Sequence, residues 1–205
     1  RLPTPHVHRM ANLPNILTSI RILLVPILVV VLLTKFDGKE FVGLALFLLA
    51  ALTDFLDGYF ARRFNLVTRF GQLLDPAADK ILIAAAFVSL VELDSSVTPS
   101  WMVVAILARE FAVNALRSHA ALEQVVIPAG LSGKIKTGAQ IIAISLLIIY
   151  NKLGEFSHLA PISLWVAVIV TLYSGADYFV RYWRRLNASA GGQRPPAPPQ
   201  PPVPA

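Results

Sequence analysis

The chain has 205 residues, of which 56% are hydrophobic and only 15% are charged, and it contains no cysteine. A soluble globular domain carries about 25% charged residues, so this composition is typical of a chain whose solvent is largely lipid. The lack of cysteine excludes disulfides, thiol catalysis and zinc–thiolate sites. The net charge of +6 does not indicate nucleic acid as a partner, because the basic residues lie at the ends of apolar segments, which is the pattern of membrane proteins.

Six apolar segments follow one another along the chain, and each approaches the roughly 20 residues that cross a bilayer. They predict six transmembrane helices, at residues 13–34, 41–63, 71–93, 98–120, 133–151 and 159–184. Turn-forming residues separate them at Asp37-Gly38, between Asp94 and Pro99, and between Asn151 and Glu155. The first segment is too long to be the apolar part of a cleavable signal peptide. We therefore expect an all-α integral membrane protein.

The Lys and Arg residues near the ends of these segments and between them fall unequally on the two sides of the membrane; Arg21, Lys80 and Arg109, which lie deeper in the predicted spans, are not counted. One side carries twelve: Arg1, Arg9, Arg62, Arg63, Arg69, Arg117, Lys134, Lys136, Arg181, Arg184, Arg185 and Arg194. The other side carries three: Lys35, Lys39 and Lys152. The positive-inside rule then places both termini in the cytoplasm and the chain in the cell (inner) membrane, among membrane lipids.

The ends of the chain differ in composition from the helical part. Residues 1–11 predict a short cytoplasmic arm, and residues 12–187 contain all six predicted helices. From Ala188 the chain is rich in Gly, Ala and Pro. Residues 188–205 therefore predict a disordered Pro-rich tail, since such a composition buries too little apolar surface to fold.

Four aspartates lie within the second and third predicted helices. Asp54 and Asp57 are three residues apart, and Asp75 and Asp79 are four apart, so each pair shares one face of its helix. Both pairs lie roughly 6–14 Å from the inner ends of two antiparallel neighbours, at 1.5 Å of rise per residue. Carboxylates this close repel unless some are protonated or cations lie between them. Oxygen ligands favour magnesium, manganese or calcium over zinc, and four carboxylates suit a two-metal site for phosphoryl-type displacement.

Small residues accompany the aspartates. Gly58 follows Asp57 directly, and Gly71 lies one turn before Asp75. Small residues on a helix face let a ligand or another backbone approach closely. The alternative is that these glycines only pack helices and that the aspartates pair with Arg62, Arg69 and Lys80.

These residues also form a known pattern. Asp54-x-x-Asp57-Gly58-x-x-Ala61-Arg62, eight further residues, and Gly71-x-x-x-Asp75-x-x-x-Asp79 resemble the signature of the CDP-alcohol phosphatidyltransferase family. The resemblance implies six transmembrane helices, a homodimer, and two metal ions (Mg²⁺ or Mn²⁺) held by the four aspartates. It also implies that Asp79 is the general base acting on the acceptor hydroxyl, and that Arg62 contacts the nucleotide diphosphate.

The resemblance extends over roughly residues 12–186, and is most similar to the phosphatidylglycerophosphate synthase subfamily. It is carried by residues 12–21, Arg109-Glu110, residues 133–137 and residues 174–178. It implies CDP-diacylglycerol as donor, glycerol 3-phosphate as acceptor, and an active site open to the cytoplasm.

A phosphorylated acceptor needs cations of its own. Those expected here are Arg109, Arg117, Lys134 and Lys136. Arginine offers bidentate contacts to phosphate, and lysine adds a point charge. Arg117 and the two lysines are alternatively positive-inside residues that bind lipid headgroups. Arg109 lies too deep for that role and alternatively pairs with Glu110 or Asp177.

The first predicted helix carries a polar group of its own. Arg21, with Asn15 and Thr18 one or two turns before it, is expected to border the nucleotide or diphosphate of CDP-diacylglycerol, near Gly58 and Gly71. Alternatively, Arg21 extends to the membrane surface as long basic side chains do.

Other functions share part of this pattern. The same signature serves cardiolipin synthases and enzymes whose acceptor is inositol phosphate, serine or choline. A cation transporter would also place carboxylates in the membrane. It would be expected to show inverted repeats or helix pairs broken by Gly and Pro, which are not evident in this sequence.

Overall fold

The structure is a computed structural model that describes residues 13–64, 69–122 and 131–191, with side chains for Leu56 and for residues 18–53, 77–121 and 132–187. Its helices are α2 (Leu13–Leu33), α3 (Lys39–Phe64), α4 (Arg69–Leu93), α5 (Ser100–Leu122), α6 (Leu131–Ile148) and α7 (Leu159–Gly191). Two short 3₁₀ turns, η1 (Tyr150–Lys152) and η2 (Gly154–Phe156), link α6 to α7. The prediction of an all-α chain with six helices is confirmed in the described part. The predicted arm at 1–11 lies outside the described residues. The predicted tail was expected to begin at Ala188, but α7 extends to Gly191. The rest of that tail, residues 192–205, also lies outside the described residues.

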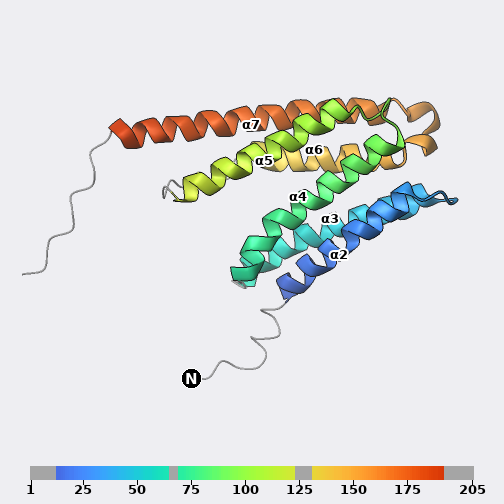
Figure 1. Ribbon diagram of the computed structural model, residues 1–205, viewed down its shortest axis with the longest axis horizontal. Helices are drawn as coiled ribbons and strands as arrows, with labels where there is room; N and C mark the ends of the chain where they lie inside the picture. The colour runs from blue at the N-terminus through green and yellow to red at the C-terminus, as the bar shows by residue number, and fades with distance from the viewer. Residues whose placement is uncertain (1–12, 65–68, 123–130, 192–205) are drawn as a thin grey trace, which may run out of the picture.

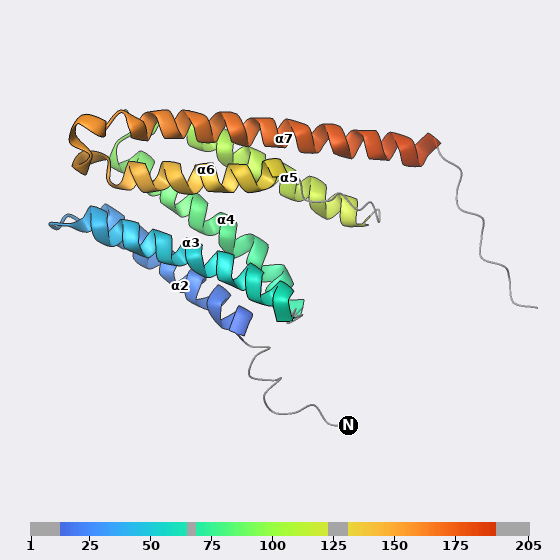
Figure 2. The same ribbon diagram turned by 180° about the vertical axis from the view of Figure 1, so that it is seen from behind.

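Successive helices run in opposite directions, so their ends gather at the two ends of a bundle (Figures 1 and 2). Helices α2, α3 and α4 form one group, and α5, α6 and α7 form the other, with α4 and α6 in contact across the two. One end of the bundle carries the loops at 34–38, 94–99 and 149–158. At the opposite end α3 finishes beside the start of α4, and both views agree on this (Figures 1 and 2).

The helix breaks fall where the sequence predicted them. Gly38 lies between α2 and α3 with φ of 81°, a left-handed conformation that glycine adopts without a steric penalty. After α4, the Asp94 carboxylate accepts hydrogen bonds from the backbone N–H and the hydroxyl of Ser96 and from the Val97 N–H. The Ser96 bonds lower the pKa of the Asp94 carboxyl and close a local turn. Pro26 is accommodated inside α2 without ending it.

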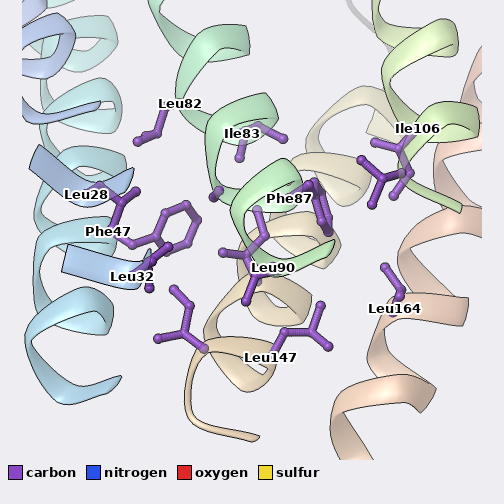
Figure 3. Packing of buried hydrophobic residues seen from close by; sticks show 14 of the residues in the cluster. Leu28, Leu32, Phe47, Leu82, Ile83, Phe87, Leu90, Ile106, Leu147 and Leu164 are labelled. Carbon is purple, nitrogen blue, oxygen red and sulfur yellow. The ribbon is translucent and has the colours of Figure 1, made fainter. Parts of the chain in front are cut away.

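The apolar core occupies the half of the bundle nearer the loops. Figure 3 shows α4 at its centre, with residues of α2 and α3 on one side and of α5 and α7 on the other. Its large members include Leu28, Leu32, Phe47, Leu82, Phe87, Leu90, Ile106, Ile144, Leu147 and Leu164. The charged residues Asp79, Lys80, Arg109, Glu110, Lys136 and Arg181 lie on the other side of this core, toward the end where α3 meets α4. The core therefore holds one half of α4, α5, α6 and α7 together, and the other halves of these helices carry the charged side chains.

The helices differ in their suitability for crossing a membrane. Among the described residues, one helical segment, Gly154–Asn187, is long and apolar enough to do so, and Thr18–Leu33 is a shorter apolar segment. Several of the other helices interrupt their apolar sequence with charge, as α5 does with Arg109, Glu110 and Arg117. By length and composition, then, the described structure supports one of the six predicted spans directly.

Candidate active site

A cavity of about 240 Å³ lies among α4, α5, α6 and α7, on the polar side of the core. Its described lining includes six basic side chains, Lys80, Arg109, Arg117, Lys134, Lys136 and Arg181, and two acidic ones, Asp79 and Glu110. The structure thus brings together all four cations predicted for the acceptor phosphate and the predicted general base. These residues are up to 57 positions apart in sequence, between Asp79 and Lys136, and meet because the helices pack side by side.

The four predicted cations lie at two depths. Arg109 and Lys136 are nearly buried, with side chains 9% and 14% exposed. Arg117 and Lys134 are exposed, and the Arg117 guanidinium lies 5.7 Å from the centre of the Tyr178 ring, a distance that allows a cation–π contact. Arg109 and Lys136 therefore form the inner part of the cavity, and Arg117 and Lys134 its mouth.

Glu110 connects the inner cations. Its Oε1 atom accepts hydrogen bonds from Arg109 Nη1 at 3.2 Å, from Lys136 Nζ, and from Gln140 Nε2 at 3.2 Å. Gln140 also bonds the Thr171 hydroxyl at 3.1 Å, which joins α5 and α6 to α7. Of the two acids considered as partners of Arg109, Glu110 is the one that contacts it. The contacts of Glu110 with Lys136 and Gln140 were missed from the sequence, although polar residues in apolar helices are the signal for such contacts.

Arg109 is also held from α7. Its Nη2 donates to the Ser174 hydroxyl at 2.9 Å. A Cβ on Gly175 would lie 2.8 Å from Arg109 Cγ, so a glycine at this position makes room for the arginine stem. The Arg109 Nε is buried and has no hydrogen-bond partner among the described residues.

Asp177, the other acid considered for Arg109, lies in a separate group. Its Oδ2 accepts from Arg181 Nη2 at 2.5 Å and from the Ser132 hydroxyl at 2.8 Å. Arg181 and Ser132 both line the cavity and were not singled out from the sequence. Their pairing with Asp177 could have been anticipated only for Arg181, which follows Asp177 by one helical turn.

Asp79 lies on α4 at the wall of the cavity and is partly exposed. The charged side chains near enough to act on it electrostatically are Lys136, Lys80, Glu110 and Arg21. Arg21 and Thr18 of α2 are 0% and 1% exposed. The alternative that Arg21 extends to the membrane surface is therefore wrong, because its side chain is enclosed by the protein near Asp79.

The other predicted ligands of metal and donor lie on helices whose side chains are not described at those positions. Outside the described side chains are Asn15, Asp54, Asp57, Gly58, Arg62, Gly71 and Asp75. Among the described side chains no group of three or more Asp, Glu or His residues could hold a metal ion. The sequence positions of Asp54 and Asp57 are about 10–15 Å from the end of α3, and those of Asp75 and Asp79 about 9–15 Å from the start of α4. Because these two helix ends lie side by side, the four sequence positions lie at similar heights along the bundle.

The chain is similar to known proteins over most of its length. Residues 11–173 match the CDP-alcohol phosphatidyltransferase family. The chain is 46% identical to the CDP-diacylglycerol–glycerol-3-phosphate 3-phosphatidyltransferase of Bacillus subtilis (strain 168), covering 88% of this chain and 100% of the relative. It is 39% identical to the Rickettsia typhi protein of the same name (83% and 96%) and 37% identical to a probable phosphatidylglycerophosphate synthase of Mycobacterium tuberculosis (87% and 85%). The family is membrane-bound and generally metal-dependent. The matching of most of the chain, together with these identities, shows that the protein belongs to the CDP-alcohol phosphatidyltransferase family.

Proposed function

We propose that this protein transfers the phosphatidyl group from CDP-diacylglycerol to glycerol 3-phosphate, giving phosphatidylglycerophosphate and CMP in phospholipid biosynthesis. The observation that carries the proposal is the cavity in which Asp79 lies with Arg109 and Lys136. Three relatives that cover most of the chain carry names for this activity. A general base and a phosphate-binding group in one cavity are what this reaction requires of the protein.

The six helices span the inner membrane, with both termini and the cavity on the cytoplasmic side. Each helix exposes a large apolar side chain by more than half of its surface: Leu23, Phe41, Val88, Val104, Ile142 and Ile169. Lipid is the solvent that suits such a surface. The cavity lies toward the end of the bundle with more basic residues, as the positive-inside rule requires of a cytoplasmic site. The protein acts as a homodimer, as the family resemblance implies.

The donor lies against α2, α3 and α4. Asp54, Asp57, Asp75 and Asp79 hold two ions of Mg²⁺ or Mn²⁺, which supply positive charge to the donor diphosphate and to the departing CMP. Arg62 binds the diphosphate, and Gly58 and Gly71 leave room for it. Asn15, Thr18 and Arg21 border the same group; the burial of Arg21 near Asp79 supports its place there.

The acceptor enters the cavity from the cytoplasm. Arg109 and Lys136 bind its phosphate, and Arg117 and Lys134 attract it at the mouth. The 1-hydroxyl oxygen of glycerol 3-phosphate forms a bond to the β-phosphorus of the donor, and the bond from that phosphorus to the oxygen of CMP breaks. Asp79 accepts the hydroxyl proton, and CMP leaves with the electron pair of the broken bond.

The choice of acceptor separates this function from its main alternative, a cardiolipin synthase or another family member with a different acceptor. Six basic and two acidic side chains in the cavity favour a phosphate monoester, which carries more negative charge than a phosphodiester such as phosphatidylglycerol. The test gives the purified protein CDP-diacylglycerol with glycerol 3-phosphate, inositol phosphate, serine or phosphatidylglycerol, and measures CMP release. Preference for phosphatidylglycerol would establish the alternative.

Arg109→Ala and Lys136→Ala should each lower kcat/KM for glycerol 3-phosphate by roughly ten- to hundredfold, because a charged hydrogen bond to phosphate is worth about 1.5–3 kcal/mol. The apparent KM for CDP-diacylglycerol should change much less. Arg62→Ala should give the opposite pattern. Steady-state kinetics with each substrate varied in turn measures both values.

Lys152→Ala is the matched control, because Lys152 is exposed at the other end of the bundle. It should leave both KM values unchanged and so exclude a general effect of lost membrane-surface charge. Equal weakening of both substrates by Arg109→Ala would place the acceptor phosphate elsewhere.

A further inference from the structure

We infer that Glu110 is a positioning residue that sets acceptor specificity, by holding Arg109 and Lys136 together as a binding pair for a phosphate monoester. This inference rests on the function proposed above. It adds a residue that touches neither substrate in that proposal and acts through the two cations.

The contacts of Glu110 carry the inference. One oxygen, Oε1, accepts from Arg109 on the same helix and from Lys136 on α6. All three side chains are nearly buried, at 9%, 9% and 14% exposed for Glu110, Arg109 and Lys136. Water therefore screens the repulsion between the two cations only weakly. The shared carboxylate offsets this repulsion and fixes both side chains at one point.

The remaining contacts hold Arg109 and Glu110 in fixed positions. Ser174 holds the outer Nη2 of Arg109, and Gly175 leaves room for the arginine stem. Gln140 donates to the same Oε1 of Glu110 and is itself bonded to Thr171. One carboxylate against two basic side chains leaves a formal charge of +1 for the three groups. The pair thus stays positive and fixed before the acceptor arrives, which lowers the ordering cost of binding it.

Two effects of removing the Glu110 charge oppose each other. If Glu110 only competed with phosphate for the cations, Glu110→Gln would tighten acceptor binding. If it positions them, the two cations separate or change rotamer, and acceptor binding weakens. The direction of the change in KM therefore distinguishes positioning from competition.

The experiment compares Glu110→Gln with wild type in purified, lipid-reconstituted protein. The expected result is a rise of about tenfold in KM for glycerol 3-phosphate with less than about twofold change for CDP-diacylglycerol. The rise in Tm that glycerol 3-phosphate gives the wild-type protein should also shrink, which reports binding without turnover. In a Lys136→Gln background, Glu110→Gln should raise the KM for glycerol 3-phosphate by a smaller factor, because one of the two cations that Glu110 positions is already absent.

Leu164→Ala is the matched control for stability. Leu164 is fully buried in the apolar core and makes no part of the hydrogen-bond network around Glu110. The variant should lower Tm without separating the two KM values. If Glu110→Gln proves too unstable to assay, Glu110→Asp decides the matter, because it keeps the charge but is too short to hold both cations at one point: the KM for glycerol 3-phosphate should rise alone, and an unchanged KM or an equal rise for both substrates overturns the inference.

The outcomes also separate this inference from the proposed function. Wild-type protein that releases no CMP with glycerol 3-phosphate would overturn both. Wild-type turnover, with a Glu110→Gln protein whose KM for glycerol 3-phosphate is unchanged or lower, or whose two KM values rise equally, would overturn the positioning role alone.

Discussion

The Asp79→Asn protein should release CMP about 10²–10⁴-fold more slowly than wild type, since that is the usual contribution of a positioned general base. Asparagine keeps the size of the side chain but cannot accept the hydroxyl proton, and it is a weaker ligand for a divalent cation. The loss should fall on kcat, because the acceptor phosphate is bound by Arg109 and Lys136 and not by Asp79. Single-turnover assays of CMP release with saturating substrates measure it.

Glu92→Gln is the matched control for Asp79→Asn. It makes the same carboxylate-to-amide change on α4, at an exposed position near the opposite end of the helix. Its activity should equal that of wild type.

Asp57→Asn and Asp75→Asn should also abolish transfer while the proteins stay folded, with Tm equal to or above the wild-type value because a repelling carboxylate is gone. Unfolding of these variants in detergent would instead indicate that the aspartates are structural partners of nearby basic residues.

Chelation of divalent cations should remove activity entirely, and Mg²⁺ or Mn²⁺ should restore it. The physical reason is charge: four carboxylates and a diphosphate at one height repel strongly unless cations lie among them. The assay titrates each metal into EDTA-treated, dialysed protein and follows CMP release and Tm together. Added metal should raise Tm of the wild type, because ligands that bind only the folded state stabilise it.

The variant Asp57→Asn supplies the control for this experiment. Its Tm should respond less to added metal than that of wild type, whereas the Tm of Glu92→Gln should respond fully. Full activity in thoroughly chelated protein would refute the two-metal site. If added metal raised the Tm of Asp57→Asn as much as that of wild type, Asp57 would not be a ligand of the ions.

The sequence alone predicted the helices well, because long apolar segments and turn residues are local signals. Asp37-Gly38 and the segment from Asp94 to Pro99 lie between helices as expected, since a left-handed glycine and an aspartate turn need only their neighbours in sequence. The helix ends moved by a few residues, as at α6, which begins at Leu131 and not at residue 133. The signature spacing also grouped the aspartates by helix face, because three or four residues make one helical turn.

Only the tertiary structure decided which polar residues meet. The sequence left Glu110 and Asp177 as equal partners for Arg109, because both lie in apolar helices and neither spacing excludes the contact. Packing of α5 and α6 against α7 brought Lys136 to Glu110, which also pairs with Arg109, while Asp177 pairs with Arg181. Likewise, Arg21 could have extended to the membrane surface by length alone, and the packing of α2 against α4 buried it. Local periodicity specifies helices and their faces, but contacts between helices depend on rotation and depth, which are set by the apolar core around Phe87 and Leu90.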